Sequence, residues 1–329
     1  MKFENIIGID VAKEQVELAF LHKGEKGIQS CLANKPKMIE RFFKESKIDL
    51  SQTLVCMEHT GIYNNHLLQF FSKHGVHVWL ESPVHIKRSI GMVRGKNDKI
   101  DALRIATFAF NHQTEVKLWT PKRDVIEKLK HLMSERGRLI RVRVLLEKPI
   151  NEARTFCSKE NLKMLRSGCS STIRAVKQDL KKINQQIIEI IKADERLNEL
   201  FNYVTSVPNV GTVVGTAILI ATNEFKSITN PRKFACHCGV APFEYSSGTS
   251  IRGKTRVSNL ADKEMKTLLH MAAVGSTSRP GEFIEYFKRK ASEGKNKMLV
   301  LNSIRNKIIH RVFACVRDKK KYQKDLLLV

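Results

Sequence analysis

The spacing of apolar residues separates a first region of short strands from a longer region of helices. Dense, partly alternating apolar residues predict two β-strands at 3–10 and 15–21, joined by a short polar turn. Similar patterns predict two further strands and three helices: strands at 53–57 and 76–80, and helices at about 36–46, 61–74 and 98–112. Strands followed by helices indicate an α/β domain over residues 1–118.

Long helices are predicted from about residue 124, within a spacer at 119–200. Six apolar residues recur at steps of three and four, as in a coiled-coil seam: Ile173, Val176, Leu180, Ile183, Ile187 and Ile190. The spacing predicts a helical hairpin or a dimerisation arm, and an intramolecular helix pair that covers its own core accounts for it equally well. Pro149 and Gly168 are expected to break these helices.

The third predicted domain, 201–329, is mainly helical and opens near a tight turn. In SVPNVGTVVGTAILIATN, Pro208 and Gly211 form this turn, and an apolar helix follows. Such a turn can present backbone N–H groups to a phosphate, as in helix-hairpin-helix modules. The same turn also precedes helices in proteins that bind no DNA, so the motif leaves nucleic-acid contact at Gly211 open.

A polar, basic loop with several serines follows at 239–258, GVAPFEYSSGTSIRGKTRVS. Arg252, Lys254 and Arg256 lie within five residues and could hold a phosphate near a serine hydroxyl. Gly248 would let the backbone approach that phosphate. By itself, a run of serine and glycine is more typical of a flexible surface loop.

The charge of the chain favours a polyanionic partner. The 329 residues carry a formal net charge of +25, and 42% of them are hydrophobic, which suits two or three folded domains. Residues 1–118 hold 17 basic and 13 acidic residues, whereas residues 119–329 hold 41 and 20. No apolar run approaches the roughly 18–20 residues that cross a membrane. Nucleic acid is therefore the expected partner.

Two further features bear on location and metal content. The first ten residues, MKFENIIGID, show no signal-peptide pattern, so a cytoplasmic location is expected. The seven cysteines are scattered, which suits reduced thiols. Cys236, His237 and Cys238 invite a zinc interpretation, but adjacent ligands suit a structural site poorly, and no second pair lies at finger spacing.

Four carboxylates stand out in this basic chain. A chain that opens with a hairpin and then alternates strand and helix can place the ends of the strands at 3–10 and 53–57 side by side, and Asp10 and Glu58 lie at those ends. Asp98 and Asp101 are three residues apart, so a helix would present both on one side.

Each carboxylate alone could be a turn or cap residue, but the combination suggests metal-dependent phosphate chemistry. Two divalent ions about 3.5–4 Å apart can bridge a scissile phosphate. Magnesium prefers oxygen ligands and keeps several waters, so three or four carboxylates suffice to hold it.

The same residues lie in motifs that resemble the IS110/IS1111-type transposases. The matching segments are IGIDVAKE around Asp10, MEHTGIY around Glu58 and VRGKNDKIDALRIA around Asp98 and Asp101. In the C-terminal part, VPNVGTVVGTAILIA and FACHCGVAPFEYSSGTSIRGKTRVS resemble the family's second domain. The resemblance covers nearly the whole chain. It implies a DEDD motif on a RuvC-like, RNase H-related fold, then a helical coiled-coil spacer and a serine-containing transposase domain.

The resemblance also implies an activity and its partners. The four carboxylates would bind Mg²⁺ or Mn²⁺, and the serine before the glycine of the SSG motif, Ser247, would be the nucleophile; Ser246 is the alternative. Such an enzyme cuts and rejoins DNA at element ends and target. It would act as a dimer or tetramer with a site composed from two subunits, guided by a structured RNA that the element encodes.

Three other functions share features with this sequence. A junction resolvase would use the carboxylates with water as the nucleophile. A sugar kinase of the actin-like fold can open with GIDVA, but the further glycine-rich phosphate loops that it needs are missing from the sequence. An inactive nucleic-acid-binding relic would bind DNA without forming a covalent adduct.

Overall fold

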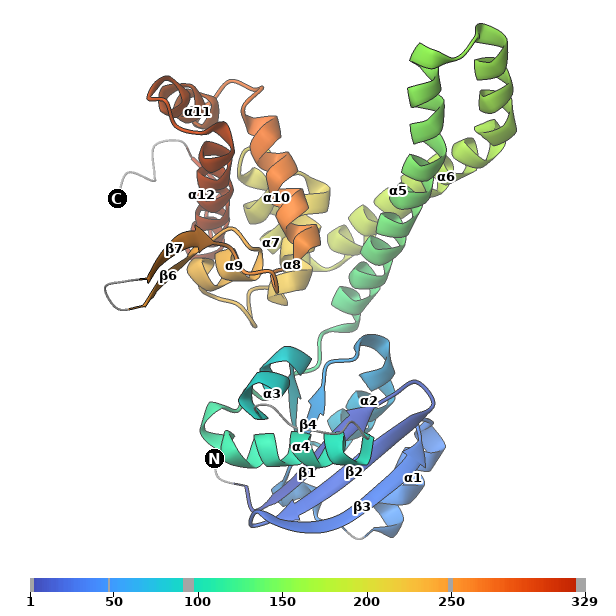
Figure 1. Cartoon of the computed structure of the whole chain (residues 1–329), viewed down its shortest axis with the longest axis vertical. Coiled ribbons are helices and arrows are strands. Elements are labelled where there is room, and N and C mark those ends of the chain that lie inside the picture. Colours follow the sequence, from blue (N-terminus) through green and yellow to red (C-terminus); the bar gives the residue numbers. More distant parts are fainter. Residues whose placement is uncertain (1–2, 47, 91–97, 248–250, 324–329) are drawn as a thin grey trace. The chain divides into compact units, whose positions relative to one another are not determined.

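The computed structural model describes residues 3–46, 48–90, 98–247 and 251–323. The chain divides into two compact units, Met1–Pro121 and Lys122–Val329 (Figure 1). Among the described residues, no helix is both long and apolar enough to cross a membrane.

The first unit is built on a five-stranded mixed sheet. Its strands are β1 (Asn5–Val11), β2 (Gln15–His22), β3 (Glu25–Ala33), β4 (Thr53–Glu58) and β5 (His77–Glu81), in the order β3-β2-β1-β4-β5. The first three strands pair antiparallel, whereas β4 runs parallel to β1 and β5 runs parallel to β4. The expected α/β domain is confirmed. Sequence patterns missed β3, because most of this strand is exposed and its apolar residues do not alternate.

Helices cover both faces of this sheet (Figure 1). On one face, α1 (Pro36–Glu45) and α2 (Asn65–Lys73) pack on Ile7 and Ile9 of β1. On the other, α3 (Pro83–Ile90) and α4 (Asp98–Asn111) share a core with Ile6. Three short 3₁₀ helices lie at Leu50–Gln52, Gly61–Asn64 and Gln113–Glu115. Because side chains alternate along a strand, Asp10 projects on the same face as Ile6, the face that α4 covers.

The second unit begins with two long antiparallel helices, α5 (Asp124–Phe156) and α6 (Lys159–Ala193). The predicted breaks at Pro149 and Gly168 are wrong, since both residues lie inside these helices. A proline within a helix removes one hydrogen bond and costs roughly 3 kcal/mol, which the remaining turns of a 33-residue helix offset. The chain turns instead at Cys157, and the Ser158 hydroxyl then caps α6 by accepting from the Asn161 N–H.

Apolar residues of the predicted seam are buried within one chain. Val176, Leu180, Ile183 and Ile187 are all at least nine-tenths buried in α6, which packs along α5. At the start of α5, Arg123 donates to Asp194 at 2.7 Å and to Glu224 at 2.9 Å, and so joins α5 to the segments after α6 and α8. The intramolecular helix pair is therefore present; a dimer seam stays a prediction.

The rest of the second unit is mainly helical, as expected. Its elements are α7 (Glu195–Ser206), α8 (Thr212–Thr222), α9 (Pro231–His237), the hairpin β6 (Phe243–Ser247) and β7 (Ile251–Arg256), α10 (Lys263–Ser276), α11 (Glu282–Ser292) and α12 (Lys297–Arg317). Ile304, Ile308 and Val312 of α12 are completely buried at the centre of these helices.

Candidate active site

Asp10 and Glu58 lie at the ends of neighbouring parallel strands. The register pairs Ile9 of β1 with Met57 of β4, so the next residues along both strands are Asp10 and Glu58. Cys56, two residues before Glu58, packs in the core beneath α4, as Ile6 does. Alternation therefore directs both carboxylates to the α4 face, and neighbouring strands are about 4.8 Å apart.

Helix α4 brings Asp101 to this face of the sheet. Its backbone passes so close to Gly8 that a Cβ atom there would lie 2.3 Å from the Ala102 carbonyl oxygen. Asp101 directly precedes Ala102, and its Oδ1 is 2.7 Å from Arg104 Nη1. Asp98 is the first residue of α4, but its side chain lies outside the described residues.

The charges of Asp10 and Asp101 both act on the carboxyl of Glu58. Partial burial raises the pKa of the Glu58 carboxyl, and the negative charges of Asp10 and Asp101 raise it further. Behind it, burial and the charges of Glu81 and Glu58 raise the pKa of the Cys56 thiol. The arrangement concentrates negative charge at one edge of the sheet, where a bound cation would stabilise the ionised carboxylates.

Two buried asparagines hold the loop that follows Glu58. The Asn64 amide donates to the Glu58 carbonyl at 2.9 Å, and its Oδ1 accepts from the Thr60 N–H at 2.7 Å. The Asn34 amide donates to the carbonyl oxygens of Ala12 at 2.9 Å and Tyr63 at 3.0 Å. These bonds tie the chain beyond Asp10 to the chain beyond Glu58, and so orient the strand ends that carry the carboxylates.

Glu81, a further acidic residue near Glu58, has a structural role. Glu81 pairs with Glu58 across β4 and β5. Its carboxylate accepts from the Ser82 N–H at 2.7 Å and from Trp79 Nε1 at 3.1 Å, and lies 3.2 Å from His85 Nδ1. These contacts hold Glu81 at the start of α3.

The oxygen donors at this edge suit a hard divalent ion such as Mg²⁺ or Mn²⁺. Among the residues whose side chains are described, no group of three acidic, histidine or cysteine side chains is already spaced to hold a metal ion. That set lacks Asp98, so only Asp10, Glu58 and Asp101 of the predicted four could be considered.

The predicted nucleophile lies on the β6–β7 hairpin of the second unit. The strands pair antiparallel, with Ser247 opposite Ile251 and Ser246 opposite Arg252. Phe243, at the start of β6, pairs with Arg256, which is exposed. The side chains of Ser246, Ser247, Arg252 and Lys254 lie outside the described residues. One hairpin thus carries both candidate serines and the three candidate cations.

Gly211 caps the N-terminus of α8, the apolar helix predicted after the VPNVG turn. The turn lines a cavity of about 470 Å³ together with Met271 and Arg279. Arg279 Nη1 donates weakly to Asn209 Oδ1 at 3.4 Å. The described part of the chain therefore places one cation beside this turn.

The Cys236-His237-Cys238 segment shows no sign of a zinc site. Cys238 is completely buried, and His237 Nε2 lies 3.8 Å from Asp262 Oδ2. Within the described part of the chain, these residues belong to no metal-binding cluster.

Sequence reasoning missed the residues that position the carboxylates. Gly8 sets the approach of α4, Arg104 pairs with Asp101, and Asn64 holds the loop after Glu58. A glycine inside a predicted strand often marks a close backbone approach, so Gly8 could have been found. The partners of Arg104 and Asn64 depend on packing, and their sequence pattern shows no signal for them.

Two family models match separate parts of the chain. Residues 7–153 match the DEDD family of IS110 elements, described as "Transposase". Residues 202–288 match a second model, described as "Transposase IS116/IS110/IS902 family". The first match contains all four predicted carboxylates, and the second contains both serines.

Similar proteins have related descriptions. The chain is 25% identical over 328 residues to the pilin gene-inverting protein of Moraxella bovis, covering 97% of this chain and 98% of that protein. It is 24% identical over 272 residues to the transposase for insertion sequence element IS1111A of Coxiella burnetii, covering 75% and 71%. RuvC of T. thermophilus, solved with a Holliday junction substrate, is 15% identical and covers 35% of this chain and 99% of its own, with a TM-score of 0.28.

Proposed function

We propose that this chain, which belongs to the IS110 family of transposases, cuts and rejoins DNA with Asp10, Glu58, Asp98 and Asp101 as metal ligands and Ser247 as nucleophile. Membership of that family makes it a DNA phosphoryl-transfer enzyme. The observation that supports the metal site best is the position of Asp10 and Glu58 at the ends of paired strands, on the face of the sheet that α4 covers. Burial there, and then the charges of Asp10 and Asp101, raise the pKa of Glu58.

The carboxylates would bind a divalent cation beside the reacting phosphate. A divalent metal bound there would stabilise the negative charge that develops on the phosphate oxygens. Asp10 and Glu58 are fixed by their strands, and Asp101 by a helix that packs directly on Gly8. Because strands and helices are rigid, they hold such ligands in place before the reaction, and the ligands do not have to become ordered during it.

The serine would divide strand exchange into two balanced steps. In the first, Ser247 Oγ forms a bond to phosphorus, the bond from phosphorus to one DNA oxygen breaks, and the hydroxyl proton passes to solvent while the leaving oxygen takes one up. In the second, a DNA hydroxyl attacks the serine phosphodiester and loses its proton to solvent, while Oγ leaves and takes one up. The covalent intermediate conserves the energy of the phosphodiester bond for rejoining.

The proposed substrate is DNA at element ends and target, with a structured RNA as the guide. The positive charge of residues 119–329, where basic residues outnumber acidic ones by 41 to 20, supports binding to nucleic-acid backbones. A relative of nearly the same length is called a pilin gene-inverting protein, so inversion of a DNA segment is proposed beside transposition. Both reactions need paired cutting and rejoining.

The experiment that tests this function is a search for a covalent adduct. Protein, guide RNA and end-labelled DNA are incubated with Mg²⁺ and separated under denaturing conditions. We expect an adduct with wild type and with Ser246→Ala, and none with Ser247→Ala. An adduct that persists in Ser247→Ala would contradict the nucleophile assignment. Cleavage by Ser247→Ala without any adduct in wild type would instead support a nuclease that uses water.

A further inference from the structure

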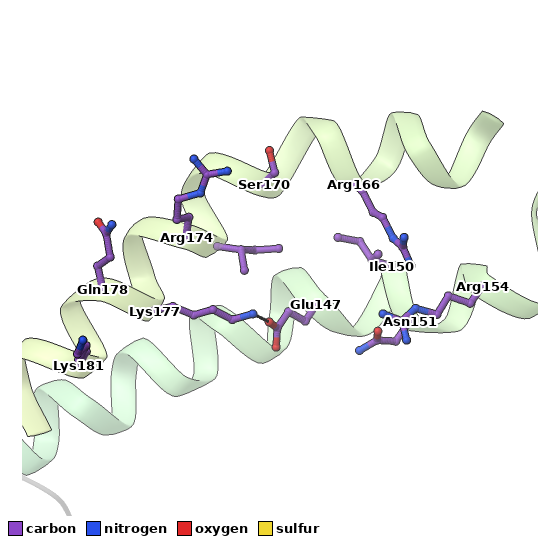
Figure 2. A pocket seen from close by; sticks show the side chains of 11 residues that line it. Glu147, Ile150, Asn151, Arg154, Arg166, Ser170, Arg174, Lys177, Gln178 and Lys181 are labelled. Carbon is purple, nitrogen blue, oxygen red and sulfur yellow. Dashed lines mark ion pairs between the residues drawn. The ribbon is translucent and has the colours of Figure 1, made fainter. Parts of the chain in front are cut away.

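A basic groove lies between the far halves of α5 and α6. It encloses about 750 Å³, and five of its lining side chains are cationic: Arg154, Arg166, Arg174, Lys177 and Lys181. Figure 2 shows these side chains coming from both helices, with Glu147 as the acidic member of the lining. The groove belongs entirely to the second unit and contains none of the proposed catalytic residues.

The cations of this groove exceed the negative charge available to them. Glu147 is already engaged, at 2.7 Å from Lys177 Nζ and 3.5 Å from Arg143 Nε, and these contacts lower the pKa of its carboxyl. Within the described part of the chain, the other four cations form no ion pair. Like charges collected along one groove repel one another, so an anionic ligand would bind there favourably.

The shape of the cationic row favours a polymer over a small anion. Arg166, Ser170, Arg174, Lys177 and Lys181 follow one another at steps of four, four, three and four, which places them on one face of α6. With a rise of 1.5 Å per residue, the row extends over about 22 Å. One DNA strand presents a phosphate every 3.4 Å or so, hence about six phosphates over that length.

The types of side chain also suit phosphates. Three of the five cations are arginines, whose planar guanidinium groups bind phosphate oxygens through two parallel hydrogen bonds. Ser170 and Gln178 add uncharged donors to the same lining. Contacts with phosphates carry no sequence information, so these side chains would hold DNA without selecting its sequence.

We propose that the groove between α5 and α6 binds the sugar–phosphate backbone of duplex DNA, as a second contact surface separate from the catalytic residues. The occupant follows from the charge excess, the length of the row and the DNA substrate of this enzyme family. The groove binds DNA through residues other than the proposed catalytic ones and adds affinity that depends on salt.

The test measures the binding of the full chain to a labelled DNA duplex by anisotropy. EDTA is present, and salt is varied from about 50 to 200 mM. The test variant is Arg166→Gln/Arg174→Gln. The matched control is Arg138→Gln/Arg141→Gln, which removes two exposed arginines from α5. Arg138 and Arg141 precede the lining residues Glu147 and Ile150 by nine positions, and therefore lie about 180° away around the helix.

Losing two phosphate contacts should reduce the slope of log K against log salt by about 1.8 for duplex DNA. We expect the slope of the test variant to fall by about 1.8. The slope of the control should change by less than about half of that amount. An unchanged slope in the test variant, or an equal change in both, would overturn the proposal. A change seen only with an RNA duplex, or only with binding between copies of the chain, would also overturn it.

The readout does not depend on the proposed function. Binding is measured without divalent metal, so the result is the same whichever residue is the nucleophile. A melting curve of each variant checks folding, and since all four substituted arginines are exposed, none should change the melting temperature.

Discussion

Gly8 of β1 lies directly against Ala102 of α4, with room for a hydrogen atom and nothing larger. A Cβ atom at Gly8 would lie 2.3 Å from the Ala102 carbonyl oxygen and 2.3 Å from the Ala106 nitrogen. Both are backbone atoms, so only a shift of the whole helix would relieve the overlap. Because Asp101 precedes Ala102, this contact sets the distance between Asp101 and the carboxylates of the sheet.

Gly8→Ala should therefore abolish DNA cleavage and destabilise the protein by about 1–3 kcal/mol, the usual cost of overpacking a core. Denaturant unfolding and a cleavage assay measure the two effects. Gly168→Ala is the control: Gly168 lies inside α6, and a Cβ there meets no atom within 4 Å. This control should gain about 0.5–1 kcal/mol and keep normal cleavage. Full activity in Gly8→Ala would contradict the role of this contact.

Glu58→Gln should raise the melting temperature of the metal-free protein. Burial and the charges of Asp10 and Asp101 raise the folded-state pKa of Glu58, so ionised Glu58 costs the fold stability once the pH exceeds that pKa. In wild type, metal at about 100 times its Kd should add about 2.7 kcal/mol of stability, and the substitution should remove most of this gain.

Calorimetric scans with and without Mg²⁺ or Mn²⁺ measure both effects. Glu81→Gln is the control, because the contacts of Glu81 with Trp79, Ser82 and His85 make it structural. It should lower the melting temperature and keep the response to metal. If Glu58→Gln responded to metal as strongly as wild type, the predicted ligand set would be wrong.

Mixing two inactive variants tests the predicted composite site. If the carboxylates of one subunit act with the serine of another, Asp10→Ala and Ser247→Ala should each be inactive alone and recover up to about a quarter of wild-type cleavage when mixed as dimers, from random pairing of subunits. The measurement is cleavage after co-expression or subunit exchange. No recovery from a mixture that does form mixed dimers would place both halves of the site in one chain.

Acidification should destabilise the second unit through His270. Burial and the charge of Arg305 lower the pKa of the His270 imidazole below its ordinary value of 6.5. At a pH between the two values the unfolded chain binds a proton that the folded chain does not, so stability falls as the pH drops below about 6.5. Unfolding measured on both sides of this pH checks the direction.

Arg305→Met should reduce the loss of stability at low pH and stabilise the protein. Arg305 is only 7% exposed, and its Nε has no hydrogen-bond partner among the described residues. Replacing such a group with an apolar side chain of similar length should gain about 1–3 kcal/mol. NMR titration should show a higher His270 pKa in the variant, and an unchanged His270 pKa would contradict the proposed coupling.

Patterns along the chain predicted much of the first unit because its strands have clear alternation. The strand at 53–57 is β4, and the helix at 98–112 is α4 within a residue. The exposed edge strand β3 has no such pattern, and β2 alone holds it in the sheet. Pro149 also misled the prediction, since the cost of one proline is local whereas the packing of α6 along α5 extends over many turns.

The sequence by itself determined which chemistry is available: carboxylates at two strand ends and one helix start, serines beside cations, and motifs of one transposase family. Side-chain period and residue type carry this information locally. Only the tertiary structure decided how near Asp101 comes to Asp10 and Glu58, because that distance depends on a glycine and an alanine about 95 residues apart in the sequence. The cationic groove likewise exists only where two helices pack, since neither helix encloses it alone.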